Sequence, residues 1–249
     1  MSLPTAILFD LDDTLVGEGH RLPALVQVCE EFAAALGDNN PGAVADTLER
    51  ELQAFWSNSD ASKAARLDGS GSGIITARRN IIARSFERLD VPYALRQAHL
   101  FSDRFTELRA AGAGVFPGAR EALHDLRTLG VRLALVTNGA AELQRAKLER
   151  FSLTSLFDHV QIEGECGFGK PDERAYVHAM AALDVQPAET WMVGDNLEWE
   201  VAAPQRLGIH AIWHDHLGRG LPTTTAIRPD RIIRSVRELI APPPAPRSP

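Results

Sequence analysis

The chain has 249 residues, of which 45% are hydrophobic and 24% charged, so it can bury a sizeable core and exceeds one average domain. Its formal net charge of -7 argues against a basic surface for nucleic acid, and its two cysteines, Cys29 and Cys166, lack the spacing of a disulfide framework or a zinc site. No apolar run approaches the ~20 residues of a membrane span, and residues 1–4 lead directly into a strand pattern, so we expect a cytoplasmic protein with no nucleic-acid or membrane partner; its oligomeric state is left open.

Short apolar runs, typical of strands buried on both faces, recur at 6–9, 133–136, 191–193 and 211–213. Helical patterns accompany the later runs, at 118–129, 141–151, 173–183 and 201–207. This alternation predicts an α/β fold with a Rossmann-like three-layer core around a parallel sheet.

The interval after the first strand breaks this alternation because it is nearly all helical in pattern, with helices expected at 22–36, 44–56, 74–89 and 94–110. We therefore predict an inserted α-helical domain. Within it, the glycine-rich segment 69–73 is interpreted as a flexible helix connection or a substrate contact. The predicted organisation is a catalytic core at 1–16 and 116–240, a helical insert at 17–115 and a disordered proline-rich tail at 241–249.

Polar residues gather where the predicted strands end, which is where parallel α/β sheets bind ligands. They are Asp10, Asp12, Asp13 and Thr14; Thr137, Asn138 and Gly139; Lys170 in a Gly-Lys-Pro turn; and Gly194, Asp195 and Asn196. Four separate segments therefore deliver polar groups to one edge of the sheet.

The acidic residues at this edge suit phosphoryl transfer. Asp10 is the candidate nucleophile, because a carboxylate can attack phosphorus to form an acyl phosphate. Asp12, two residues later, can protonate the leaving alkoxide and then deprotonate water. Packing Asp10, Asp12 and Asp195 around a phosphate dianion requires cations, and Mg²⁺ prefers such oxygen ligands.

Four segments resemble, in order, the four motifs of haloacid dehalogenase-like hydrolases: Asp10–Leu15 (DLDDTL), Val136–Gly139 (VTNG), Gly169–Pro171 (GKP) and Val193–Asn196 (VGDN). The insert resembles that family's small helical cap, as found in phosphoglycolate phosphatase and related sugar and nucleotide phosphatases. The resemblance implies Mg²⁺-dependent hydrolysis of a small phosphorylated metabolite, a phosphate monoester, through an aspartyl-phosphate intermediate.

The resemblance also implies a ligand set for the metal. The Asp10 and Asp195 side chains and the main-chain carbonyl of Asp12 would bind Mg²⁺. Relatives commonly carry a second aspartate five positions after the first one of the fourth motif, where this chain has Glu200. We therefore include Glu200 as a predicted ligand with a longer reach.

The phosphate itself would be bound by other motif residues. Lys170 would place a positive charge between nucleophile and phosphate, and Thr137 with the following Asn138 and Gly139 amides would bind phosphate oxygens. Asp13 stands where relatives often have glycine, so we expect it to serve as a turn residue.

The same residues bear on three alternatives to a phosphatase: a dehalogenase, a phosphomutase and a catalytically weak relative. Dehalogenation is disfavoured, because cleaving a carbon–halogen bond needs no acid such as Asp12. A phosphomutase shares every core motif and stays the alternative, as does a catalytically weak regulatory or binding relative, for which Glu200 is the motivating feature.

Two further patterns are set aside. The run from Gly164 to Lys170 begins like a nucleotide-binding P-loop, but Pro171 supplies neither the hydroxyl nor the amide that such a loop needs. The second pattern comprises His210, His214, Asp215 and His216, whose histidines we expect to be solvated loop residues rather than metal ligands.

Selectivity for the leaving group is expected from the helical cap. Its connections at 15–21 and 113–117 contain glycines and could hinge. Arg78 and Arg79 follow the glycine-rich segment and are the candidates for contacting the substrate, with solvated helix arginines as the alternative.

Overall fold

The computed structural model describes residues 2–17, 19, 21–57, 59–67 and 72–240. The predicted disordered tail at 241–249, and residues 69–71 of the glycine-rich segment, lie outside these residues. The chain divides into two compact units. The first comprises residues 1–16, 115–138 and 144–249, and the second comprises residues 17–114 and 139–143.

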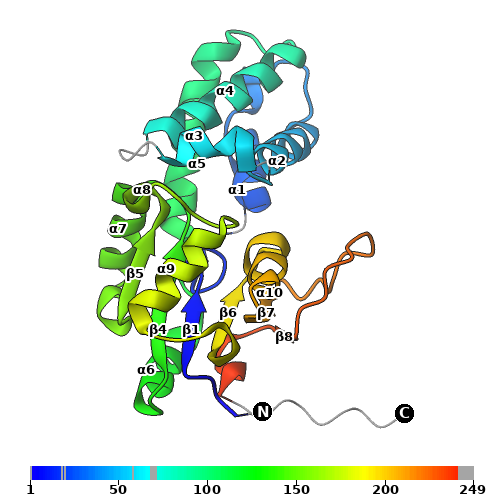
Figure 1. Ribbon diagram of the computed structural model, residues 1–249. Helices are drawn as coiled ribbons and strands as arrows, with labels where there is room; N and C mark the ends of the chain where they lie inside the picture. The colour runs from blue at the N-terminus through cyan, green and yellow to red at the C-terminus, as the bar shows by residue number, and fades with distance from the viewer. Residues whose placement is uncertain (1, 18, 20, 58, 68–71, 241–249) are drawn as a thin grey trace. The chain divides into compact units, whose positions relative to one another are not determined.

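The first unit is built on a six-stranded parallel sheet with the order β5-β4-β1-β6-β7-β8. Its strands are β1 (Ala6–Phe9), β4 (Arg132–Thr137), β5 (His159–Ile162), β6 (Thr190–Gly194), β7 (His210–His214) and β8 (Arg231–Ile233). Figure 1 shows β1 between β4 and β6. The predicted α/β class with a parallel sheet is confirmed.

Helices cover both faces of this sheet. One face packs on α6 (Ala119–Thr128), α7 (Ala141–Arg150) and the 3₁₀ turn η5 (Val236–Leu239), and the other packs on α9 (Glu173–Leu183) and α10 (Ala203–Arg206). The side chains of β1 explain why it lies at the centre. Ile7 and Phe9 enter the first apolar layer, whereas Ala6 and Leu8 enter the second, and all four are fully buried. Alternate residues of a strand point to opposite faces, so a continuous apolar run suits a strand covered twice.

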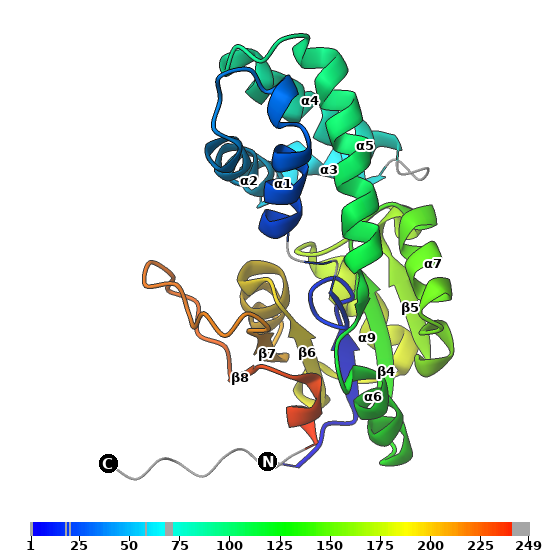
Figure 2. The same ribbon diagram turned by 180° about the vertical axis from the view of Figure 1, so that it is seen from behind.

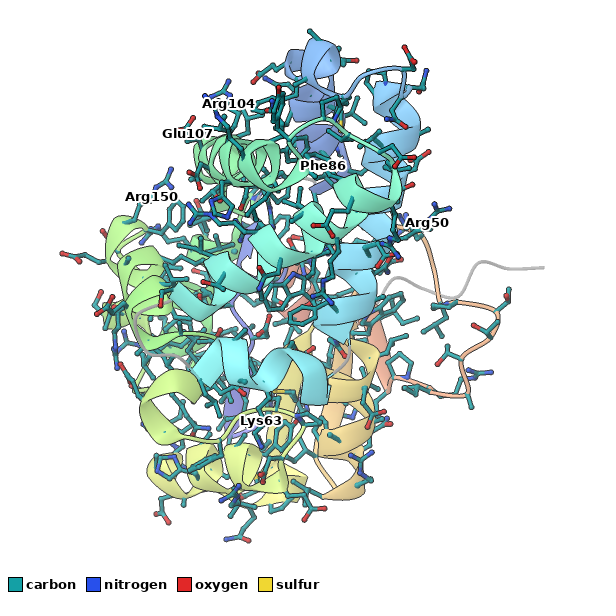
Figure 3. The ribbon with its side chains drawn as sticks, turned by 90° about the horizontal axis from the view of Figure 1, so that it is seen from above. Arg50, Lys63, Phe86, Arg104, Glu107 and Arg150 are labelled. Atoms are coloured by element: carbon teal, nitrogen blue, oxygen red, sulfur yellow. The ribbon has the colours of Figure 1, made fainter. Side chains whose placement is uncertain are left out.

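The second unit is helical and has its own apolar core. Its helices are α1 (Arg21–Glu31), η1 (Ala33–Ala35), α2 (Pro41–Ser57), α3 (Ser59–Leu67), α4 (Ser72–Arg88) and α5 (Ala94–Gly112). Figure 2 shows α4 running beside α5 and α1 beside α2. Phe86 (Figure 3) belongs to the buried core of this unit, and its ring is edge-on to that of Phe101.

The remaining elements are short. Strands β2 (Val16–Gly17) and β3 (Gly114–Val115) form a separate two-stranded sheet. The others are η2 (Thr154–Leu156), α8 (Glu163–Cys166), η3 (Pro187–Glu189) and the π-helix η4 (Leu197–Ala202). Within the described part of the chain, no helix has the length and apolar character needed to cross a membrane.

Candidate active site

Three motif segments of the first unit meet because their strands are neighbours in the parallel sheet. Asp10 directly follows β1, Thr137 ends β4, and Asp195 directly follows β6. The Asp10 amide donates to the Val193 carbonyl at 3.0 Å, which fixes the nucleophile candidate against the end of β6. The carboxyl edge of the central strands thus carries the predicted site residues.

Lys170 is the buried cation of this edge. Its ammonium donates to Asp10 Oδ1 at 2.6 Å and lies 2.8 Å from Glu200 Oε1, and its side chain is 1% exposed. Burial alone would lower the pKa of Lys170, but attraction by Asp10 and Glu200 outweighs burial and raises it above its ordinary value. Lys170 is therefore held as a cation against the candidate nucleophile.

Glu200 occupies a fixed position behind Lys170. Its second oxygen accepts the Asn196 amide at 2.7 Å, so both carboxylate oxygens contact protein donors. The residue lies in η4, and a π turn is a rare geometry that occurs often at functional sites. Its side chain passes directly over Gly194, where an added Cβ would lie 2.1 Å from the Glu200 Cγ. Burial raises the pKa of Glu200 to about 7, although Lys170 favours the charged form.

The acidic residues at this edge exceed the cations beside them. Burial, and then the carboxylates of Glu200, Asp10 and Asp13, raise the pKa of Asp195 well above its ordinary value. Such crowding is relieved by a cation, and the donors are the hard oxygens that suit Mg²⁺.

The structure limits how such an ion could be held. Among the residues it describes, no group of three or more His, Cys, Asp or Glu side chains could hold a metal on its own. The predicted ligands are therefore two carboxylates, Asp10 and Asp195, and the main-chain carbonyl of Asp12, and an ion held by so few protein donors would need water and substrate as its other ligands. Direct ligation by Glu200 stays a prediction.

Asp12 contacts two residues of α7 that the sequence interpretation did not assign to the site. Gln144 donates to Asp12 Oδ2 at 2.9 Å, and the Lys147 ammonium lies 2.8 Å from Asp12 Oδ1. Gln144 also donates to Thr137 Oγ1 at 2.6 Å and to the Asn138 carbonyl at 3.0 Å. The only sequence signal was their spacing of three residues on a helix directly after the second motif.

Asn138 connects the second and third motifs. Its side-chain amide donates to the Lys170 carbonyl at 2.6 Å, and its Oδ1 accepts the Lys170 amide at 2.8 Å. Gly169 makes room for this clamp, because an added Cβ would lie 2.5 Å from Asn138 Oδ1. Gly139 follows with a φ of 131°, a conformation that favours glycine. The contacts of Thr137, Asn138 and Gly139 with phosphate stay predictions.

The region around Asp13 corrects one expectation. Asp13 has a φ of 57°, as suits a turn residue. His214, expected to be solvated, is instead buried in β7, with Nδ1 3.1 Å from the Asp13 carbonyl and its ring edge-on to Phe116. Burial, and then His216, lower the pKa of His214. The expectation failed because β7 spans His210–His214: the His214 imidazole enters the interior, and Nε2 of His210 is buried as well.

Arg78 and Arg79 lie on α4 in the helical unit, and both contact α5. Arg79 forms an ion pair with Asp103 at 2.6 Å, whereas Arg78 donates to Thr106 Oγ1 and lies over the Phe105 ring. Their proposed role in reading the leaving group stays a prediction.

Comparisons with known proteins agree with the geometry of the first unit. The sequence profile of the haloacid dehalogenase-like hydrolases matches residues 4–208. Phosphoserine phosphatase of Thermus thermophilus is 33% identical over 250 residues, which cover 94% of this chain and 96% of that protein. Phosphoglycolate phosphatase of Rhodospirillum rubrum is 28% identical over 212 residues, or 84% of this chain and 79% of that protein.

A solved structure shows the same fold. The HAD-hydrolase YfnB from Bacillus subtilis, bound to magnesium, matches with a TM-score of 0.69 and 19% identity, over 96% of this chain and 98% of that chain. The profile match spans most of the chain, and the Thermus thermophilus relative is matched over nearly its whole length. The chain therefore belongs to the haloacid dehalogenase-like hydrolases, as its four motifs predicted.

Proposed function

We propose that this chain is a Mg²⁺-dependent phosphatase that hydrolyses a small phosphate monoester through an aspartyl phosphate on Asp10. The observation that carries the proposal is the 2.6 Å contact between buried Lys170 and Asp10 Oδ1, beside the crowded carboxyl of Asp195. A carboxylate held against a buried cation, with a second acid two residues on, suits attack on a dianionic phosphate.

The reaction takes two steps. A carboxylate oxygen of Asp10 bonds to phosphorus while the bond to the ester oxygen breaks, and Asp12 donates a proton to that oxygen. Asp12 then takes a proton from water as the water oxygen bonds to phosphorus, which releases inorganic phosphate and restores Asp10. Lys170 neutralises charge on the phosphoryl oxygens in both steps. Asp10, Asp195 and the Asp12 carbonyl would hold Mg²⁺, which would supply Lewis-acid charge for the transfer.

The substrate class follows from the relatives rather than from a resolved binding site. Those at 28–33% identity include phosphatases named for phosphoserine, ribulose-1,5-bisphosphate and phosphoglycolate. A panel of these esters with a generic aryl phosphate is therefore the first screen. Adding a bisphosphate primer and looking for isomerisation separates hydrolysis from the phosphomutase alternative.

Asp10→Asn tests the nucleophile. A neutral amide cannot form the acyl phosphate, so the variant should lose turnover completely and retain no phosphoryl group after quenching. Crystals grown with beryllium fluoride and Mg²⁺ should show the phosphate mimic on the Asp10 carboxylate of the wild-type protein. An adduct on another residue, or turnover by Asp10→Asn at the wild-type rate, would refute the assignment.

A further inference from the structure

The general acid–base candidate is held by a helix that none of the four motifs includes. Asp12 accepts from Gln144 through Oδ2 at 2.9 Å and pairs with Lys147 through Oδ1 at 2.8 Å. Gln144 and Lys147 are three residues apart on α7, so they lie on one side of the helix. Two donors on two different oxygens fix the rotation of the Asp12 carboxylate, which neither contact could do alone.

The pair of Asp12 and Lys147 is not sealed from solvent. The side chains of Asp12 and Lys147 are 32% and 26% exposed, so the pair is accessible to water. The geometry thus combines a fixed orientation with access to water, which a general acid–base group needs.

Gln144 contacts both Asp12 and the second motif. The residue is 2% exposed, and its side-chain amide nitrogen lies 2.6 Å from Thr137 Oγ1 and 3.0 Å from the Asn138 carbonyl, besides its contact with Asp12. An amide nitrogen has two hydrogens, so three acceptors must share them, and the amide is held from three directions. The same side chain therefore sets the position of the acid–base candidate relative to a predicted phosphate-binding residue.

We infer that Gln144 and Lys147 are positioning residues that orient Asp12 for both proton transfers; this inference rests on the proposed function. Proton transfer in such reactions contributes about 10²–10⁴-fold to the rate, and misplacement by about 1 Å can cost much of an oriented contribution. Loss of either residue should therefore lower kcat while leaving KM nearly unchanged.

A double-mutant cycle separates positioning from general structural damage. Lys147→Met should lower kcat by about tenfold or more, but by less than about twofold when Asp12 is already replaced in an Asp12→Asn background. Lys147→Arg, which keeps a cationic donor, should recover part of the lost rate. Arg150→Met is the matched control, because Arg150 (Figure 3) is an exposed cation on the same helix. Its guanidinium lies over the Phe151 ring.

The outcomes that would overturn the inference are distinct. Equal losses in both backgrounds would show that Lys147 does not act through Asp12. A raised KM at constant kcat would make Lys147 a substrate contact instead. Failure of the proposed function would look different, because the wild-type protein would then form no phosphoryl adduct on Asp10.

A structural readout tests the positioning whether or not phosphate esters are turned over. In crystals of the metal-free protein, the double variant Gln144→Glu/Lys147→Met should show the Asp12 carboxylate rotated away from its wild-type position. Circular dichroism and thermal unfolding would verify that the variant is folded. A carboxylate that keeps its wild-type position in the folded variant would refute the role of α7.

Discussion

Gly194 is a residue whose lack of a side chain determines where a neighbouring carboxylate lies. An added Cβ would meet the Glu200 Cγ at 2.1 Å and its Cδ at 2.8 Å, well inside contact distance. The carboxylate of Glu200, which reaches Lys170 at 2.8 Å, would have to move. The buried pair of Glu200 and Lys170 therefore requires a residue without a side chain at position 194.

We expect Gly194→Ala to lower both stability and turnover. Overpacking of a tight site costs about 1–3 kcal/mol, and displaced Glu200 would no longer hold Lys170 against Asp10. Urea unfolding and kcat measure the two effects. Gly112→Ala is the control, because a Cβ there meets its nearest atom at 3.6 Å, an ordinary contact, and should change neither. Wild-type kcat in a folded Gly194→Ala protein would contradict this account of Glu200.

At the same scale, the sequence predicted the residues of the site better than their contacts. Asp10 and Lys170 were expected to meet, because both belong to the four motifs that the chain shares with the family, and they do. The contact of Lys147 with Asp12 links positions 135 apart, and nothing in a helical pattern indicates which strand end a helix side chain will reach. Burial of His214 was missed for the same reason, since it depends on how far a strand continues.

The π-helix η4 places Glu200 where its carboxylate contacts both Lys170 and the Asn196 amide. Asn196 caps it by accepting the amides of Glu198 and Trp199, each at 3.0 Å, while Glu200 turns back to accept the Asn196 amide. The wide turn and the longer acidic side chain thus occur together at this position.

Glu200→Asp should therefore impair the enzyme although the charge is kept. An aspartate is about 1.5 Å shorter, so it cannot contact both Lys170 and the Asn196 amide from this turn. We expect kcat to fall by about tenfold or more in steady-state assays. Glu198→Asp is the control on the same element, because Glu198 is half exposed and pairs with surface Arg206 at 3.1 Å, and it should retain the wild-type rate. Equal rates for both variants would show that the reach of Glu200 is unimportant.

Elements whose apolar residues recur at a regular spacing were predictable from the sequence, and short or irregular elements were not. The helix at Glu173–Leu183 and the strand at Ala6–Phe9 match their predicted bounds because apolar spacing determines both. β5, whose sequence is HVQI, was missed because its polar residues hide the strand pattern. The wide turn at Leu197–Ala202 was assigned in part to an ordinary helix, because period alone does not separate π from α turns.

For the molecule as a whole, charge balance predicts a metal requirement. The buried cation Lys170 contacts Asp10 and Glu200, and the pKa of nearby Asp195 is still raised despite its attraction to Lys170. We expect EDTA to abolish phosphatase activity and Mg²⁺ to restore it, with Ca²⁺ a poor substitute because its coordination is larger and looser.

The same prediction has a readout that does not depend on turnover. Mg²⁺ should raise the Tm of the wild-type protein, since a ligand that binds only the native state stabilises it. The rise should be lost in Asp195→Asn, which removes a predicted ligand. Full activity after rigorous chelation, together with a Tm that Mg²⁺ leaves unchanged, would remove the metal from the site.

The parallel pairing of β1 also has a consequence for how the chain acquires its fold during synthesis. β1 pairs with two strands that come far later, since Ala6 faces Arg132 and Phe9 faces Val193. At about 5–20 residues per second, a ribosome needs on the order of ten seconds or more to make the second partner. Until β4 is made the AILF segment has no native strand beside it, and one of its edges stays unpaired until β6 follows. Long-range pairing of this kind slows folding. The helices of residues 21–112, which have an apolar core of their own, complete their synthesis within the same interval. The nascent chain therefore carries a foldable helical unit behind an unpaired hydrophobic strand, which makes that strand the natural target of chaperones that bind apolar segments.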